Sequence, residues 1–227
     1  MSNPPNPSGN PRSIRSNGDR RGVLLIAAAV TALVVVVGIV VALGGTSSTN
    51  STTSDKNTGY GPVVVEGASL PAFSTTSGDE ANGVTPPFVE GVDPDGNPVS
   101  IGGGRGSQPT MVVFLAHWCP HCQKEVPVIA EWIEQNGPPE GVALVSIATA
   151  TVAERPNYPP SAWLEREGWQ PVVLADDEQG SAATAYGLTA FPFFVAVDAQ
   201  GKVVERVSGE LTVQQIEDLV ARARGVG

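Results

Sequence analysis

The six residues HWCPHC, at positions 117 to 122, contain both cysteines and both histidines of this 227-residue chain. Such a window could form a redox-active disulfide, a structural disulfide or a metal site. A structural disulfide closing so short a loop would stabilise the fold by only about 2 kcal/mol. A zinc or copper site would need a tight ring stiffened by Pro120, and the sequence has no second ligand pair of cysteines or histidines. Thiol–disulfide exchange without a metal or other cofactor is therefore the favoured chemistry.

The residues around the cysteines favour a reactive thiolate. An apolar run at 111–116 precedes the motif and a helical pattern follows it, so Cys119 is expected at a helix start. There the unpaired N–H groups and the helix dipole, roughly half a positive charge, favour a thiolate. Pro120 suits the first helical turn, and His121 adds a second donor or positive charge near the sulfur. Cys122 faces the same side, so we predict Cys119 as the nucleophile and Cys122 as the resolving thiol.

The elements expected to position the motif alternate between strands and helices. In chain order they are a hairpin of 88–92 and 98–101, a strand at 111–116, a helix ending at 136, a strand at 142–148, a helix at 161–167, a strand at 172–175, a helix at 179–186, a hairpin of 193–197 and 202–207, and a last helix opened by a capping box of Thr212 and Gln215. This order predicts an α/β fold whose central mixed sheet is mainly parallel, with helices on both faces and an antiparallel edge.

The segments before this pattern differ in composition. Residues 1–22 are Asn, Pro, Ser, Gly and Arg-rich and are predicted to be a disordered tail. Residues 23–43 are apolar apart from Thr31 and a single glycine, and as a helix they would span a bilayer; a buried core helix is the alternative. Residues 44–83 are predicted to be a flexible linker and a partly ordered lead-in with a possible strand. The folded domain is expected at 84–227.

The charge distribution predicts the orientation of the apolar segment. Four arginines precede it and the next basic residue is Lys56, so the positive-inside bias places the N-terminus in the cytoplasm. The domain would then lie outside the cell membrane, anchored by one helix. A cleaved signal peptide is the alternative, although the apolar run exceeds the usual 7 to 15 residues. The chain's net charge is -10 although its tail is basic, which gives no electrostatic reason to bind nucleic acid.

The motif and its context resemble a known family. WCPHC at a helix start after an apolar strand resembles the active site of thioredoxin-fold oxidoreductases, and its Pro-His dipeptide is similar to that of DsbA-type oxidases. FLAHWCPHCQKEVP, PPFVEGVDPDGNPVSI and LADDEQGSAATAYGLTAFPFFVAVDAQGKVVERVSG resemble the membrane-anchored TlpA/ResA-like thioredoxins over residues 84–225. The resemblance implies a thioredoxin-like domain whose Cys119–Cys122 disulfide exchanges with exported proteins and with a membrane or extracytoplasmic redox partner.

The resemblance also implies roles for residues outside the cysteine pair. Pro192 aligns with the family's cis-proline and Phe191 with a position that contacts substrate; an ordinary trans proline is the alternative. Glu125 lies where relatives carry a glutamate near the disulfide, and would relay the proton that Cys122 loses, unless it is a solvated helix carboxylate. Trp118 is expected to shield the sulfurs and shape the docking surface, or simply to pack.

Two considerations give opposite directions of electron flow. DsbA lies near about -120 mV and thioredoxin near about -270 mV, and a Pro-His dipeptide is typical of the oxidising end. The TlpA/ResA-like context instead favours reduction, as in cytochrome c maturation. We favour disulfide donation because the potential is set at the sulfurs; a non-catalytic redox or metal sensor is the other alternative. His117 is interpreted as a neighbour of the site or as simply exposed.

Overall fold

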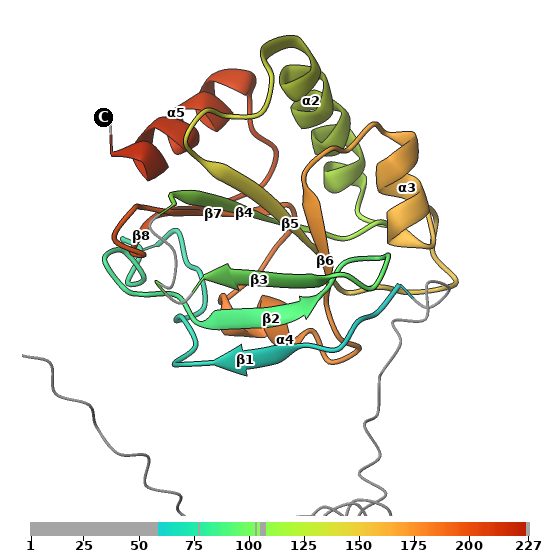
Figure 1. Cartoon of the computed structure of the whole chain (residues 1–227), viewed down its shortest axis with the longest axis horizontal. Coiled ribbons are helices and arrows are strands. Elements are labelled where there is room, and N and C mark those ends of the chain that lie inside the picture. The colour runs from blue at the N-terminus through green and yellow to red at the C-terminus, as the bar shows by residue number, and fades with distance from the viewer. Residues whose placement is uncertain (1–58, 77, 103, 105–107, 226–227) are drawn as a thin grey trace, which may run out of the picture. The chain divides into compact units, whose positions relative to one another are not determined.

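The computed structural model describes residues 59–76, 78–102, 104 and 108–225 (Figure 1). The predicted tail, the predicted membrane span and the first part of the linker lie outside the described residues. No helix within the described ranges is both long enough and apolar enough to cross a membrane.

A five-stranded mixed sheet forms the centre of the domain (Figure 1). Its middle strand is β4 (Thr110–Leu115), which pairs in parallel with β5 (Ala143–Ala148), and β5 pairs in parallel with β6 (Val172–Ala175). On the other side, β7 (Phe193–Val197) is antiparallel to β4, and β8 (Val203–Ser208) is antiparallel to β7. All five strands lie within one residue of their predicted positions. The strands β4 and β7 read as unbroken apolar runs because the sheet is covered on both faces.

Three helices cover one face of this sheet (Figure 1). They are α2 (Pro120–Asn136), α3 (Pro160–Arg166) and α5 (Val213–Arg224), whose apolar side chains share one core. The predicted capping box is confirmed, because the Thr212 side chain accepts a hydrogen bond from the Gln215 N–H and the Gln215 side chain accepts one in return.

A helix and a small antiparallel sheet cover the opposite face (Figure 1). The helix is α4 (Ser181–Ala185), and the sheet consists of β1 (Val64–Glu66), β2 (Phe88–Val92) and β3 (Pro98–Gly102). The hairpin of β2 and β3 confirms the predicted one, and helices do lie on both faces of the central sheet. The possible strand in the lead-in is β1, which extends the small sheet by pairing with β2.

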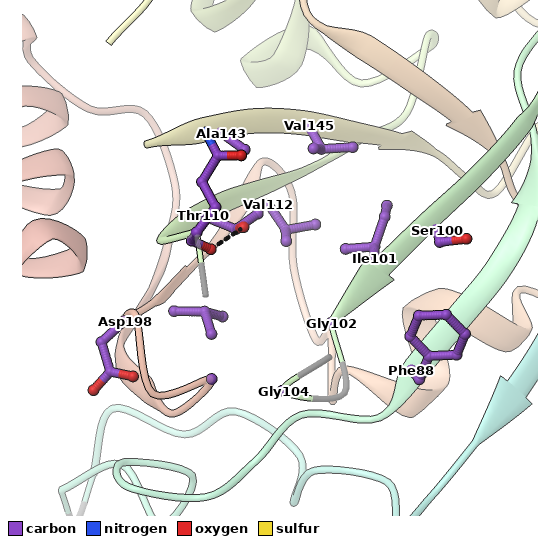
Figure 2. Close-up of a pocket in the computed structure, with 13 residues that line it drawn as sticks. Phe88, Ser100, Ile101, Gly102, Gly104, Thr110, Val112, Ala143, Val145 and Asp198 are labelled. Atoms are coloured by element: carbon purple, nitrogen blue, oxygen red, sulfur yellow. Dashed lines mark hydrogen bonds between the residues drawn. The ribbon is translucent and has the colours of Figure 1, made fainter. Parts of the chain in front are cut away.

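A cavity of about 290 Å³ lies at the end of the central sheet where β4 and β5 begin (Figure 2). Its lining includes Thr110 and Ala143, at the starts of the neighbouring strands β4 and β5, and Val197, at the end of β7. The cysteines instead follow the end of β4. The cavity and the motif therefore lie at opposite ends of the sheet, and the cavity is not part of the candidate site.

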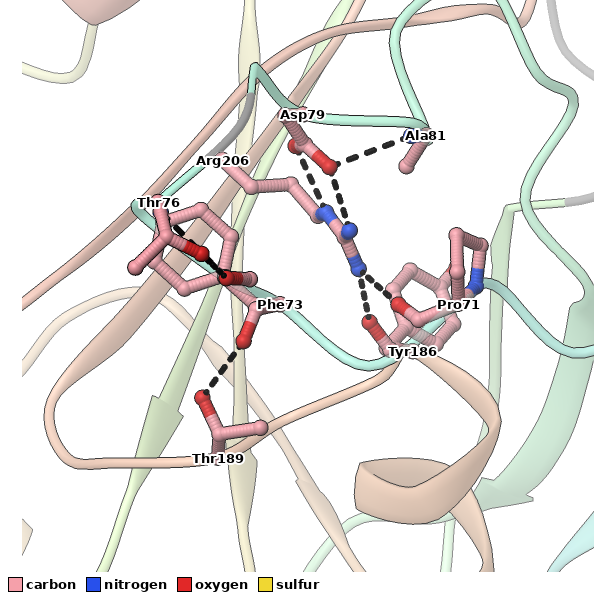
Figure 3. Close-up of polar contacts among 9 residues, drawn as sticks. Pro71, Phe73, Thr76, Asp79, Ala81, Tyr186, Thr189 and Arg206 are labelled. Carbon is pink, nitrogen blue, oxygen red and sulfur yellow. Dashed lines mark hydrogen bonds and ion pairs between the residues drawn. The ribbon is translucent and has the colours of Figure 1, made fainter.

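The buried Arg206 of β8 fixes the lead-in to the domain (Figure 3). Its guanidinium donates two hydrogen bonds to the carboxylate of Asp79, with Nε 2.8 Å and Nη2 2.5 Å from the oxygens. Its Nη1 donates to the backbone carbonyls of Pro71 and Tyr186 at 2.8 and 3.0 Å, and the group lies 5.5 Å from the ring centre of Phe73. These contacts satisfy a buried charge and hold the chain between β1 and β2 against the central sheet.

Candidate active site

The two cysteines lie at the start of α2, directly after β4. Cys119 is the N-cap, with extended backbone (φ -76°, ψ 121°) and 6% of its surface exposed. Pro120 takes the first helical position, where its missing N–H leaves no helical bond unmade. Cys122 lies one turn later and is fully buried, and both thiols are free. The predicted position of Cys119 at the start of the helix is confirmed, and Cys119 is the more exposed residue of the two.

The buried Cys122 is held as a thiol. Burial raises its pKa well above the ordinary value, and a hydrogen bond at the Ala116 backbone opposes this. The neighbouring Cys119 and the charge of Glu125 raise the pKa further. Because ionising this sulfur is unfavourable, any reaction that uses Cys122 as a nucleophile or leaving group needs a nearby group to exchange its proton.

Glu125 is placed to be that group. It follows Cys122 by one turn of α2 and is 1% exposed, so it is not a solvated helix carboxylate. Its Oε2 accepts a hydrogen bond from the Leu211 N–H at 2.9 Å, whereas its Oε1 has no hydrogen-bond partner among the described residues. Burial raises the pKa of Glu125 to about 7, against the lowering effect of the Leu211 bond, and the charge of Glu210 raises it further. The carboxyl can therefore exchange a proton near neutral pH.

His121 has a carboxylate partner on the loop before α5. Its Nδ1 lies 2.6 Å from Glu210 Oε1, and the Nζ of Lys124 lies 3.3 Å from the same oxygen. These two contacts lower the pKa of Glu210, so this carboxylate stays ionised. The sequence predicted a donor or charge near the sulfur, but it held no signal for a partner 89 residues away.

His117 is buried, at 1% exposure, so the expectation of an exposed side chain is wrong. Its Nε2 accepts a hydrogen bond from the Val152 N–H at 3.1 Å, which assigns the ring proton to Nδ1, and Nδ1 donates to the Pro156 carbonyl at 2.6 Å. Burial lowers the pKa of His117, in keeping with this neutral form. The imidazole thus fastens the loop between β5 and α3 to the end of β4.

Three loops meet around Trp118. Its Nε1–H donates to the Ala150 carbonyl at 2.7 Å, and its ring lies edge-on to Phe191, with centroids 6.1 Å apart at 80°. The Phe191–Pro192 peptide bond is cis, as the family resemblance implies. The guanidinium of Arg155 lies over the indole, 5.4 Å from its ring centre. The structure therefore brings Trp118 together with Phe191, the residue before the cis proline, and it adds Arg155, which no pattern in the sequence indicated.

Comparison with known proteins connects this arrangement to a family. The Redoxin family model matches residues 66–220. The thiol-disulfide oxidoreductase ResA of Bacillus cereus is 26% identical over 151 residues, which cover 66% of this chain and 82% of that protein. A thiol:disulfide interchange protein DsbE homolog of Paracoccus denitrificans is 31% identical over 101 residues, covering 44% of this chain and 51% of that protein. Against several other curated relatives, the chain spans 57 to 60% of their length.

A solved structure gives the fold. The crystal structure of a DsbF homologue from Corynebacterium diphtheriae superimposes with a TM-score of 0.53 at 17% identity, covering 67% of this chain and 99% of that one. The domain therefore has the thioredoxin-like α/β fold that the sequence predicted.

Proposed function

The chain is a thiol–disulfide oxidoreductase of the redoxin family, and from that premise we propose that it donates disulfides to exported proteins through Cys119 and Cys122. One observation carries the proposal: Cys119 caps α2, and the free thiol of Cys122 lies buried one turn later. We place the reaction outside the cytoplasm, with residues 23–43 as a single membrane anchor, on the basis of the apolar length and the arginines before it.

The proposed reaction has two exchange steps. A substrate thiolate attacks the Cys119 sulfur of the oxidised pair, and the electron pair of the broken Cys119–Cys122 bond leaves on Cys122. A second thiolate of the substrate then attacks the substrate sulfur of the mixed disulfide. This forms the substrate disulfide and releases Cys119 as a thiolate at the helix N-terminus, where the N–H groups and dipole stabilise it. Two electrons pass from the substrate dithiol to the protein.

Glu125 supplies the proton for the first step. Cys122 leaves into buried surroundings that disfavour its thiolate, so it must be protonated there. Because the pKa of Glu125 is about 7, a large share of these carboxyls carry a proton at neutral pH. In the reverse direction the same carboxylate accepts the proton from Cys122.

The substrate chain is proposed to bind beside the cis peptide bond. Phe191 and Trp118 are partly exposed and form the walls next to Cys119. The backbone before Pro192 would pair with an extended substrate segment as an added strand. Renewed oxidation of the cysteines requires a membrane or extracytoplasmic partner that accepts two electrons. The proposed reaction uses no nucleic acid, metal or other cofactor.

A disulfide reductase is the second candidate, and the contact between His121 and Glu210 favours it. A histidine whose Nδ1 is bonded to a carboxylate at 2.6 Å contributes less net positive charge near Cys119. When the Cys119 thiolate is less stabilised, the reduced protein becomes less stable relative to the disulfide form. The protein is then more reducing. The TlpA/ResA-like resemblance of the sequence also implies reduction.

An activity test addresses both candidates and the sensor alternative. We expect the oxidised protein to accelerate disulfide formation in reduced ribonuclease A, with no acceleration by a Cys119→Ser variant. Faster reduction of insulin in the presence of dithiothreitol, without ribonuclease oxidation, would identify a reductase instead. Wild-type protein inactive in both assays would support a sensor and overturn the proposal.

A further inference from the structure

Arg155 differs from the other basic side chains of the described ranges because no oxygen atom accepts a hydrogen bond from its guanidinium. The other lysine and arginine side chains of the described ranges each contact an oxygen atom, namely Lys124, Arg166, Lys202, Arg206, Arg222 and Arg224. Within the same ranges, the Arg155 side chain contacts the ring of Trp118, and no carboxylate or carbonyl accepts from it. An acidic chain offers many carboxylates, so an unpaired guanidinium beside the cysteine motif calls for an explanation.

The guanidinium is held in place rather than simply solvated. The guanidinium lies over the indole of Trp118, and the hydrogen bond from the indole N–H to the Ala150 carbonyl fixes that indole. The loop that carries Arg155 is itself fastened through the Val152 N–H and the Pro156 carbonyl to the buried ring of His117. A guanidinium that lies over an aromatic ring keeps N–H donors available, and these match the two oxygens of a carboxylate.

Two other basic side chains near the motif already have a partner. His121 and Lys124 both contact the Oε1 atom of Glu210. Arg155 is therefore the cation around Cys119, within the described ranges, that remains open to an incoming anion. Its exposed side chain lies beside the aromatic residue that directly precedes Cys119.

We propose that Arg155 is a specificity-determining residue that favours substrate segments with an acidic side chain next to the reacting cysteine. The inference rests on the proposed function, since it requires a mixed disulfide at Cys119. A substrate carboxylate would bind the free edge of the guanidinium while the substrate sulfur meets Cys119. The chain's net charge of -10 repels acidic partners at long range, but at physiological salt charges more than about 8 Å apart are largely screened.

Two single-cysteine peptides test the proposal. They are end-blocked and differ only in a glutamate or a glutamine beside the cysteine. Each peptide thiolate attacks Cys119 of the oxidised full-length protein, the Cys119–Cys122 bond breaks, and Cys122 is released and protonated. Stopped-flow tryptophan fluorescence gives the second-order rate constant at 0.15 M salt. Each value is divided by that peptide's rate with bis(2-hydroxyethyl) disulfide, an uncharged reagent, which removes differences in thiol reactivity without adding a second charge effect.

We expect wild-type protein to react about threefold faster with the glutamate peptide, the size expected for one exposed ion pair. Arg155→Gln should bring the ratio to about one, while Arg155→Lys should retain part of it. Arg222→Gln, which removes a cation of α5 paired with Glu205, is the matched control and should leave the ratio unchanged.

The outcomes separate this inference from the proposed function. If wild type reacts with both peptides at the same normalised rate, or if Arg155→Gln keeps the full ratio, the role of Arg155 is refuted while thiol–disulfide exchange stands. If wild type reacts with neither peptide, the proposed function itself fails, and the inference fails with it.

Discussion

Replacing Glu125 with glutamine should stabilise the reduced protein at pH 8 but not at pH 4. Burial of the carboxyl raises its pKa from 4.5 to about 7. Each pKa unit corresponds to about 1.4 kcal/mol, so ionising Glu125 in the folded protein costs about 3 kcal/mol. Glutamine has nearly the same shape and can still accept the hydrogen bond from the Leu211 N–H. The substitution therefore removes the ionisation and little else.

The sign of the effect follows from proton linkage. Below about pH 4.5 the carboxyl is protonated in both the folded and the unfolded protein, so the variant and wild type have similar stability. Between about pH 4.5 and 7 the folded state of wild type binds more protons than its unfolded state, so stability falls as the pH rises. Above about pH 7 the full cost is present in wild type and absent from the variant.

Urea unfolding at pH 4 and pH 8, under reducing conditions, measures this difference. The variant should be more stable than wild type by about 3 kcal/mol at pH 8, with a much smaller difference at pH 4. Glu134→Gln, at an exposed position of the same helix, is the control and should show no such dependence. An equal difference between Glu125→Gln and wild type at both pH values would refute the reasoning that Glu125 is a buried acid with a raised pKa.

Three further predictions test the site and the fold. Cys122→Ser should accumulate mixed disulfides with substrate on a non-reducing gel, whereas Cys119→Ser should accumulate none; the reverse pattern would exchange their proposed roles. Thr212→Ala removes a helix cap and should lower the free energy of unfolding by about 1 kcal/mol in urea, and an unchanged midpoint would contradict this. Arg206→Gln leaves the Asp79 carboxylate without its ion-pair partner and should cost about 3 kcal/mol, with faster proteolysis between β1 and β2; wild-type stability would show that this contact does not hold the lead-in.

The sequence predicted the central strands well because their signals are local. MVVFLA and the strand at 193–197 are continuous apolar runs, and this pattern arises wherever both faces of a strand are covered. The turn at 93–98 and the capping box before α5 depend on residues only a few positions apart. The start of α2 at Pro120, and hence the position of Cys119 before it, was predicted from a local sequence pattern of the same kind.

The contacts that shape the site could not be predicted in this way. His117 is buried because the loop after β5 closes over it, through hydrogen bonds to residues 35 and 39 positions away. Likewise, the contact between Arg155 and Trp118 and the hydrogen bond between His121 and Glu210 form only when the chain has folded. Such polar contacts between distant segments leave no periodic pattern in the sequence. Glu125 could be placed near the cysteines by its spacing, but its burial depends on the packing of Leu211 above α2.

The reduction potential of the Cys119–Cys122 pair tests the central claim most directly. Wild-type protein would be equilibrated in glutathione buffers of defined ratio, and the reduced fraction would be counted by alkylation and mass spectrometry. A protein that donates disulfides should show a single two-electron transition at a potential above about -230 mV. A transition below about -230 mV, among the reducing thioredoxins, or no two-electron transition at these cysteines, would contradict the account.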